Sequence, residues 1–272
     1  MKNTLLLTIL ISTLIACDGG GMAENINHSG LKISAADIEK LVNAKIYFAH
    51  QSVGYNILDG IRDVLGKYDE TLNIVETTDV SKLTGSFFAH SSIGENTRPI
   101  TKITEFYNNM NNGMGQSVDI AFLKLCYVDI NSETDVDSLF KEYQSIFNKL
   151  KLQYPQITFI HFTDPLVAQQ TGLKAFIKKI LGRQLSGVED NLRRQEYNEL
   201  LRAAYSGKEP LFDIAEIEST KPDGSRNVHS LNGKKYFSMV PEYTSDGGHL
   251  NVDGRDQIAE KLIKFISELR VK

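Results

Sequence analysis

Two kinds of apolar pattern alternate along most of the chain. Short runs in which nearly every residue is apolar predict buried strands at 45–49, 72–75, 119–125, 157–161 and 211–214. Between them, apolar residues recur at helical spacing, which predicts helices at 35–43, 52–66, 100–110, 135–154, 173–181, 191–205 and 252–269. The stretch 81–98 is mostly polar and is expected to be a loop. Strands that alternate with helices favour one α/β domain with a five-stranded parallel sheet covered on both faces.

The first residues follow a different pattern. A short positive start is followed by an uncharged, mostly apolar run at 5–16, which is too short for a membrane span of ~20 residues but typical of an export signal. The run ends in Leu-Ile-Ala-Cys17, which resembles the bacterial lipobox, where the cysteine is lipidated after cleavage. A plain signal peptide and a buried N-terminal helix are the alternatives.

The lipobox resemblance divides the chain into three parts. Residues 1–16 are expected to be a lipoprotein signal peptide, and the glycine-rich stretch 17–35 a flexible tether. Residues 36–272 then form the folded domain. The resemblance implies an exported protein that is lipid-anchored to the bacterial cell envelope, on its periplasmic or outer face.

Composition narrows the possible partners. The chain has 272 residues with 30 basic and 34 acidic side chains, so its formal charge is −4, and loss of Lys2 with the signal would make it more negative. A slightly acidic chain does not favour nucleic acid as a partner. None of the six histidines has metal-ligand spacing, and no glycine-rich phosphate motif opens a helix, so we expect no metal and no cofactor. The sequence indicates no oligomeric state.

Two motifs follow predicted strands and carry reactive side chains. The first strand ends in His50-Gln51-Ser52, and a serine there has an exposed hydroxyl near a helix N-terminus, which favours developing negative charge. An ordinary helix N-cap would also explain Ser52. Near the C-terminus, Asp246 precedes His249 by three residues across a Gly-Gly bend. A carboxylate so placed can orient an imidazole that acts as general base, although a solvated polar turn is the alternative.

Together, strand–Ser52–helix and Asp246-x-x-His249-Leu-Asn-x-x-Gly254 resemble the SGNH (GDSL-type) hydrolase superfamily. Ser92-Ile-Gly94-Glu-Asn96-Thr is similar to the second block of that family, and the segment 119–129 occupies the position of the third. The resemblance spans about residues 45–268. It implies a flavodoxin-like, three-layer α/β/α fold.

The resemblance also implies roles for individual residues. Ser52 would be the nucleophile, His249 the base and Asp246 its partner, while Ser52 and Gly94 N–H groups would form the oxyanion hole. His50-Gln51 replaces the usual Gly-Asp, and Val128 replaces the asparagine of the third block. Another donor must then come from elsewhere, and the candidates are Asn96, which we include in the expected oxyanion hole, with Asn131, Tyr127 and Lys124. The residues expected to contact substrate are His50, Gln51, Tyr127 and Asp129.

The expected function is that of a serine esterase. Its substrates would be acylated small molecules or glycans, most simply O-acetyl esters on carbohydrate, since the chain is expected to be exported and anchored. An O-acyltransferase would use the same residues with a sugar hydroxyl in place of water. Two further alternatives are a glycan- or envelope-binding lipoprotein without catalysis, and a lipase or thioesterase that acts at the membrane.

Overall fold

A computed structural model describes residues 33–170 and 187–269, together with residues 172, 177, 180, 181 and 185. The expected signal peptide, Cys17 and nearly all of the expected tether lie outside these residues, as does most of the expected helix at 173–181. The first described element is helix α1 (Ala35–Val42), which the side chain of Ser34 caps. No helix in the described ranges is long and apolar enough to cross a membrane.

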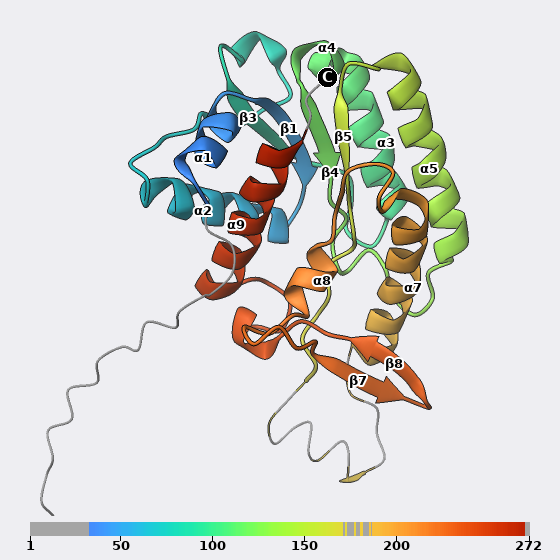
Figure 1. The fold of residues 1–272 in the computed structure, drawn as a ribbon. Helices are drawn as coiled ribbons and strands as arrows, with labels where there is room; N and C mark the ends of the chain where they lie inside the picture. The colour runs from blue at the N-terminus through green and yellow to red at the C-terminus, as the bar shows by residue number, and fades with distance from the viewer. Residues whose placement is uncertain are drawn as a thin grey trace, which may run out of the picture.

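A six-stranded sheet, in which every neighbouring pair is parallel, forms the centre of the molecule (Figure 1). Its strands lie in this spatial order: β2 (Ile74–Glu76), β3 (Phe87–Ser92), β1 (Lys45–His50), β4 (Ile120–Leu123), β5 (Thr158–Phe162) and β6 (Leu211–Phe212). The chain moves from β1 to one side of the sheet and returns to β4 on the other. The carboxyl ends of β3, β1 and β4 therefore border the crevice in which such sheets bind ligands.

The α/β class is confirmed, but the expected number of five strands is wrong because β3 lies inside the segment 81–98 that was expected to be a loop. Only the first half of β3 is apolar. In its polar second half, His90 and Ser91 are buried because each side chain finds a partner: Ser91 Oγ lies 2.8 Å from Tyr47 Oη, and His90 Nδ1 lies 3.2 Å from His50 Nε2. These cross-strand bonds replace the apolar pattern that would have marked a strand.

Helices cover both faces of the sheet and make three layers (Figure 1). One face carries α1, α2 (Val53–Gly66), α8 (Ile214–Glu218) and α9 (Val252–Glu268). The other carries α3 (Pro99–Asn109), α5 (Val136–Gln153) and α7 (Val188–Tyr205). On the central strand β1, Ile46 and Phe48 enter the first core, while Tyr47 and Ala49 enter the second. The strand is apolar from Ile46 to Ala49 because both its faces are buried there.

The remaining elements are short. They are η1 (Val80–Lys82), η2 (Met110–Met114), α4 (Gly115–Ser117), a hairpin of β7 (Val228–Leu231) and β8 (Lys234–Phe237), and η3 (Pro241–Tyr243). The strand expected at 211–214 ends at Phe212, because the Asp213 side chain accepts from Glu216 N–H and caps α8.

The last helix packs directly on the first long one, α9 against α2 (Figure 1). Gly60 allows this approach, since a Cβ at that position would lie 2.5 Å from the carbonyl oxygen of Arg255. The Asn56 side chain of α2 also accepts a hydrogen bond from Leu250 N–H at 3.3 Å. The segment before α9 is thereby held beside the start of α2, where Ser52 lies.

Candidate active site

Ser52 occupies a strained turn between β1 and α2. Its backbone has φ 50° and ψ −110°, in a region that residues with a Cβ rarely adopt. The side chain makes no capping hydrogen bond to α2, so the interpretation of Ser52 as an ordinary N-cap is wrong. Instead, Ser52 Oγ lies 2.6 Å from Nε2 of His249. The turn directs the hydroxyl toward an imidazole that can accept its proton.

Asp246 fixes the other side of the imidazole. Its Oδ2 lies 2.6 Å from His249 Nδ1, and its Oδ1 accepts backbone N–H groups from Gly248 at 2.9 Å and His249 at 2.8 Å. Burial raises the pKa of the Asp246 carboxyl, but these backbone and imidazole hydrogen bonds outweigh burial and hold the pKa well below its ordinary value. Asp246 therefore stays ionised and favours the tautomer with a proton on His249 Nδ1.

The rest of the motif anchors this turn to α9. Asn251 is the N-cap of α9, with its Oδ1 accepting from Gly254 N–H at 3.0 Å, and its Nδ2 donates to the carbonyl of Glu242 at 2.8 Å. Gly254 permits a close approach, since a Cβ there would lie 2.4 Å from Tyr243 O. The spacing Asp-x-x-His-Leu-Asn-x-x-Gly is thus the spacing of one compact turn and the helix that holds it.

Ser52, His249 and Asp246, hereafter the triad, form a continuous hydrogen-bonded chain that is open to solvent. The side chains of His249 and Asp246 are 45% and 57% exposed. An imidazole held between a carboxylate and a serine hydroxyl can remove the hydroxyl proton and return it to a leaving group. The arrangement therefore has the chemistry of nucleophilic acyl transfer, on substrates that reach an open surface.

Gly94 lies at the second loop of the site but does not present the expected donor. Its backbone is left-handed, with φ 56°, and its N–H donates to Glu105 Oε2 of α3 at 2.7 Å. A Cβ at Gly94 would lie 2.5 Å from the Lys102 backbone nitrogen, so only glycine fits. Because Glu105 already takes the N–H, the expected role of Gly94 as an oxyanion donor does not fit this geometry.

The two residues before Ser52 support the turn from within. The Gln51 side chain donates to the carbonyls of Ile93 at 2.6 Å and Gly94 at 2.7 Å, which links the nucleophile turn to the loop after β3. His50 is completely buried, and burial lowers its pKa to about 2, so it remains neutral. The expectation that His50 contacts substrate does not fit its burial, and Gln51 is committed to the loop.

Asp129 is buried too, and this position does not fit the expected substrate contact. It is 1% exposed, and its Oδ2 pairs with Lys102 Nζ at 2.6 Å. Tyr127 does lie at the surface of the site: its ring meets that of His249 edge-on, with centroids 5.9 Å apart. Its hydroxyl has no hydrogen-bond partner among the described residues.

Sequence reasoning missed Lys102 and Glu105, the two α3 residues that hold the loop after β3. A signal for Lys102 was present in the pattern of that helix. Lys102, Ile103 and Phe106 share one buried face, so a lysine stands at a position where helical spacing requires an apolar side chain. A buried charge needs a buried partner, and that requirement pointed to a structural ion pair.

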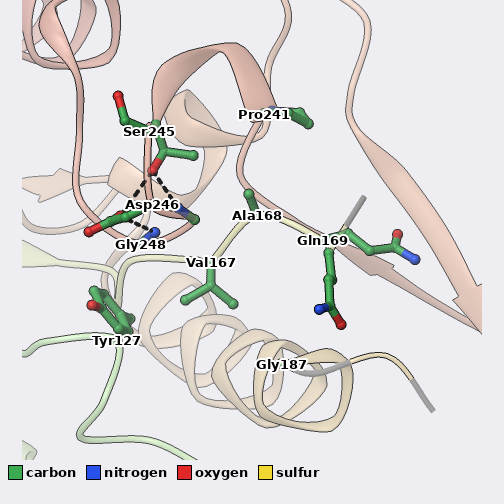
Figure 2. A pocket seen from close by; sticks show the side chains of 12 residues that line it. Tyr127, Val167, Ala168, Gln169, Gly187, Pro241, Ser245, Asp246 and Gly248 are labelled. Carbon is green, nitrogen blue, oxygen red and sulfur yellow. Dashed lines mark hydrogen bonds between the residues drawn. The ribbon is translucent and has the colours of Figure 1, made fainter. Parts of the chain in front are cut away.

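A pocket of about 530 Å³ adjoins the triad on the Asp246 side (Figure 2). Figure 2 shows Tyr127, Asp246 and Gly248 on one side of it and Gln169 on the other. The twelve residues that line it are Tyr127, Val167, Ala168, Gln169, Gln170, Gly187, Pro241, Thr244, Ser245, Asp246, Gly247 and Gly248. Apart from Asp246, whose oxygens are occupied by the turn, this wall is neutral and mixes hydroxyl and amide groups with small apolar surfaces.

The comparisons with known proteins identify similar folds. No protein-family model and no curated protein matches the chain. The periplasmic domain of a Salmonella ser. Paratyphi A lipopolysaccharide acetyltransferase is 16% identical with a TM-score of 0.48, over 85% of this chain and 88% of that one. A G-D-S-L family lipolytic protein from Veillonella parvula is 16% identical with a TM-score of 0.46, over 82% and 98%. A carbohydrate esterase family 3 protein from Talaromyces cellulolyticus is 13% identical with a TM-score of 0.44, over 83% and 98%.

Proposed function

We propose that this protein is a serine esterase that removes O-acyl groups, most simply O-acetyl groups, from carbohydrate. The observation that carries the proposal is the unbroken chain Ser52 Oγ–His249 Nε2 and His249 Nδ1–Asp246 Oδ2, with both contacts at 2.6 Å. Such a chain requires residues that are far apart in sequence to meet in one geometry, and the capping role that would otherwise explain Ser52 is absent.

The reaction follows from the three side chains. Ser52 Oγ forms a bond to the ester carbonyl carbon while its proton passes to His249 Nε2, and the carbonyl electron pair moves onto the oxygen. When that oxygen reforms the carbonyl, the C–O bond to the alcohol breaks and the alcohol takes the proton from His249. Water then attacks the acyl-serine in the same way and releases the acid. Asp246 remains an anion throughout and stabilises the imidazolium.

The neutral pocket beside the triad supports a sugar as the alcohol part of the ester. Hydroxyl and amide groups that alternate with small apolar surfaces suit a pyranose ring, whereas an acyl chain of many carbons would need a continuous apolar groove. The side chains that supply this mixed surface include Tyr127, Gln169, Ser245 and Val167. The open triad is accessible to sugars within a polymer. A lipid anchor at Cys17 would hold the enzyme at the cell envelope, close to such polymers.

Hydrolysis of p-nitrophenyl acetate by the wild type and by Ser52→Ala tests the proposal. Ser52→Ala is expected to lose at least about 1,000-fold in kcat, because the nucleophile is removed. Ser86→Ala is the matched control, since Ser86 lies next to β3 and donates only to the Asn43 carbonyl. A fluorophosphonate should label the wild type and Ser86→Ala but not Ser52→Ala.

Substrate series distinguish the proposal from its rivals. Acetylated sugars are expected to be better substrates than p-nitrophenyl esters of long fatty acids, whereas the reverse order would indicate a lipase. Equal ester hydrolysis by wild type and Ser52→Ala would refute the serine mechanism. A folded wild type that hydrolyses no ester and takes no fluorophosphonate label would instead favour a binding protein.

A further inference from the structure

The segment 164–168, which follows β5, leads into the pocket beside the triad and is held by buried side chains. Asn198 Oδ1 accepts the N–H of Asp164 at 2.6 Å, and Asn198 Nδ2 donates to the Asp164 carbonyl at 2.9 Å. Asn191 binds both backbone groups of Val167 in the same way, at 3.1 and 2.8 Å. Both asparagines are 1% exposed, so water does not compete for these bonds. The segment therefore has a fixed position before any ligand enters the pocket.

Ala168 joins this segment to the turn that carries the triad. Its N–H donates to the carbonyl of Gly247 at 2.8 Å, and Gly247 lies between Asp246 and His249 in the chain. Ala168 and Gly247 both line the pocket, and so does the next residue, Gln169 (Figure 2). The Gln169 side chain is therefore only one residue away from a direct bond to the triad turn.

The Gln169 side chain has an unused acceptor. Its Oε1 atom is buried and has no hydrogen-bond partner in the part of the chain that the structure describes. A buried amide oxygen without a donor costs free energy, because it has lost its water and gained no bond in exchange. The last torsion of a glutamine side chain has a broad minimum, so the amide can turn its oxygen toward a donor in the pocket. The matching ligand is one that donates a hydrogen bond.

The polar groups near Gln169 in the pocket wall already have partners or face water. Thr244 Oγ1 accepts the N–H of Gly247 at 2.9 Å and lies 3.3 Å from Asp246 Oδ1. Asp246 itself is bound to His249 and to the backbone of its own turn. Ser245 is exposed, so water can be its partner. None of the lining side chains in the described chain is cationic, so the wall favours a neutral donor such as a hydroxyl group.

We propose that Gln169 determines specificity by accepting a hydrogen bond from a free hydroxyl group of the sugar, next to the acylated one. This inference rests on the proposed esterase function and narrows its substrates to partly acylated sugars. The neighbouring hydroxyl groups of a sugar ester lie on the same ring as the ester, and the pocket borders the triad through Asp246. A fully acylated sugar has no hydroxyl donor and would leave the Gln169 oxygen unpaired.

Fluorinated substrates test the need for a donor. Methyl glucopyranosides with a single acetyl group on one of the ring hydroxyls are compared with analogues in which a hydroxyl next to the acetyl group is replaced by fluorine, which is small and cannot donate. For the best of these substrates, the wild type is expected to have a kcat/KM about 10- to 100-fold higher than for its fluoro analogue. Fluorine makes the neighbouring alcohol a better leaving group, so intrinsic reactivity would not explain such a loss.

Variants of Gln169 assign the effect to this side chain. Gln169→Leu has no amide, so its kcat/KM for the hydroxyl substrate should fall to the level of the fluoro analogue and the preference should vanish. Gln169→Glu keeps an acceptor oxygen and should retain most of the preference. Gln116→Leu is the matched control and should keep the wild-type preference, since Gln116 is an exposed residue of α4. Thermal unfolding of all four proteins checks that each is folded.

The outcomes separate this inference from the function on which it rests. A wild type that hydrolyses hydroxyl substrates and their fluoro analogues equally well would refute the need for a donor. A Gln169→Leu enzyme that keeps the wild-type preference would refute the assignment to Gln169. In both cases the esterase function stands. If the wild type hydrolyses p-nitrophenyl acetate but none of the acetylated sugars, the proposed carbohydrate substrate fails and the inference fails with it.

Discussion

Replacement of Asp246 by asparagine should invert the tautomer of His249. The Oδ1 atom of Asp246 accepts two backbone N–H groups, from Gly248 and His249, and lies 3.3 Å from the hydroxyl of Thr244. Only an oxygen can remain at that position, so the NH₂ group of the introduced amide must occupy the place of Oδ2. It would then donate to His249 Nδ1 and move the imidazole proton to Nε2, where the base faces Ser52.

An imidazole with its proton on Nε2 cannot accept the serine proton. The expected loss in kcat is about 10,000-fold, which corresponds to about 5.5 kcal/mol of transition-state stabilisation. Stability should change little, since the asparagine oxygen keeps both backbone hydrogen bonds and the side chain is 57% exposed. The substitution thus separates catalysis from folding.

Two measurements test this reasoning. Hydrolysis of p-nitrophenyl acetate gives kcat, and nitrogen chemical shifts of ¹⁵N-labelled histidine report which ring nitrogen carries the proton. The wild type should show the proton of His249 on Nδ1, and Asp246→Asn should show it on Nε2. Activity within tenfold of the wild type, or an unchanged tautomer in the inactive variant, would contradict the argument.

Two further predictions concern residues that support the site. Gln51→Ala should lower the free energy of unfolding by about 1–3 kcal/mol, since the carbonyls of Ile93 and Gly94 lose their donor. It should also lower kcat, because the loop after β3 is then held less firmly. Urea unfolding measures the first effect and ester hydrolysis the second. An unchanged urea midpoint would contradict the stabilising role of the two Gln51 hydrogen bonds. Burial raises the pKa of Glu218 from its ordinary 4.5 to about 8, so the folded protein keeps a proton that the unfolded chain releases. That contribution to stability is complete below pH 4.5 and is lost as the pH rises through about 8, at up to about 1.4 kcal/mol per pH unit. Glu218→Gln keeps an acceptor for Leu166 N–H but has no proton to lose, so its stability should decline less steeply with pH. Thermal unfolding curves recorded across this pH range measure the decline. A decline as steep as in the wild type would contradict the assignment to Glu218.

The sequence predicted the parts of the molecule whose signals are local. The strand β4 and the centre of β1 are continuous apolar runs because helices cover both faces of the sheet there. The turn from Asp246 to His249 was predictable for a similar reason, since its bonds join residues only three apart. The role of Ser52 could not be predicted from local signals alone, because its contact with His249 depends on the packing of α9 on α2.

The errors arose where a distant partner decides the role of a polar side chain. The second half of β3 carries His90 and Ser91, which are buried because β1 supplies a histidine and a tyrosine hydroxyl beside them. Asp129 was expected to face substrate because it follows β4, but it is buried and forms an ion pair with Lys102 of α3. The buried face of α3 marks Lys102 as a charge that needs a partner, but no periodic pattern identifies which distant residue is the partner of Asp129, His90 or Ser91.

The distance along the chain between nucleophile and base also has a consequence for biosynthesis. Ser52 precedes His249 by 197 residues. A ribosome therefore releases the serine, its strand and its helix long before the histidine turn and α9 exist. Until the histidine turn has been made and α9 packs on α2, the polypeptide holds a serine without a base. The triad would thus be completed in a single late step, and a product that ends before His249 would have no base for Ser52.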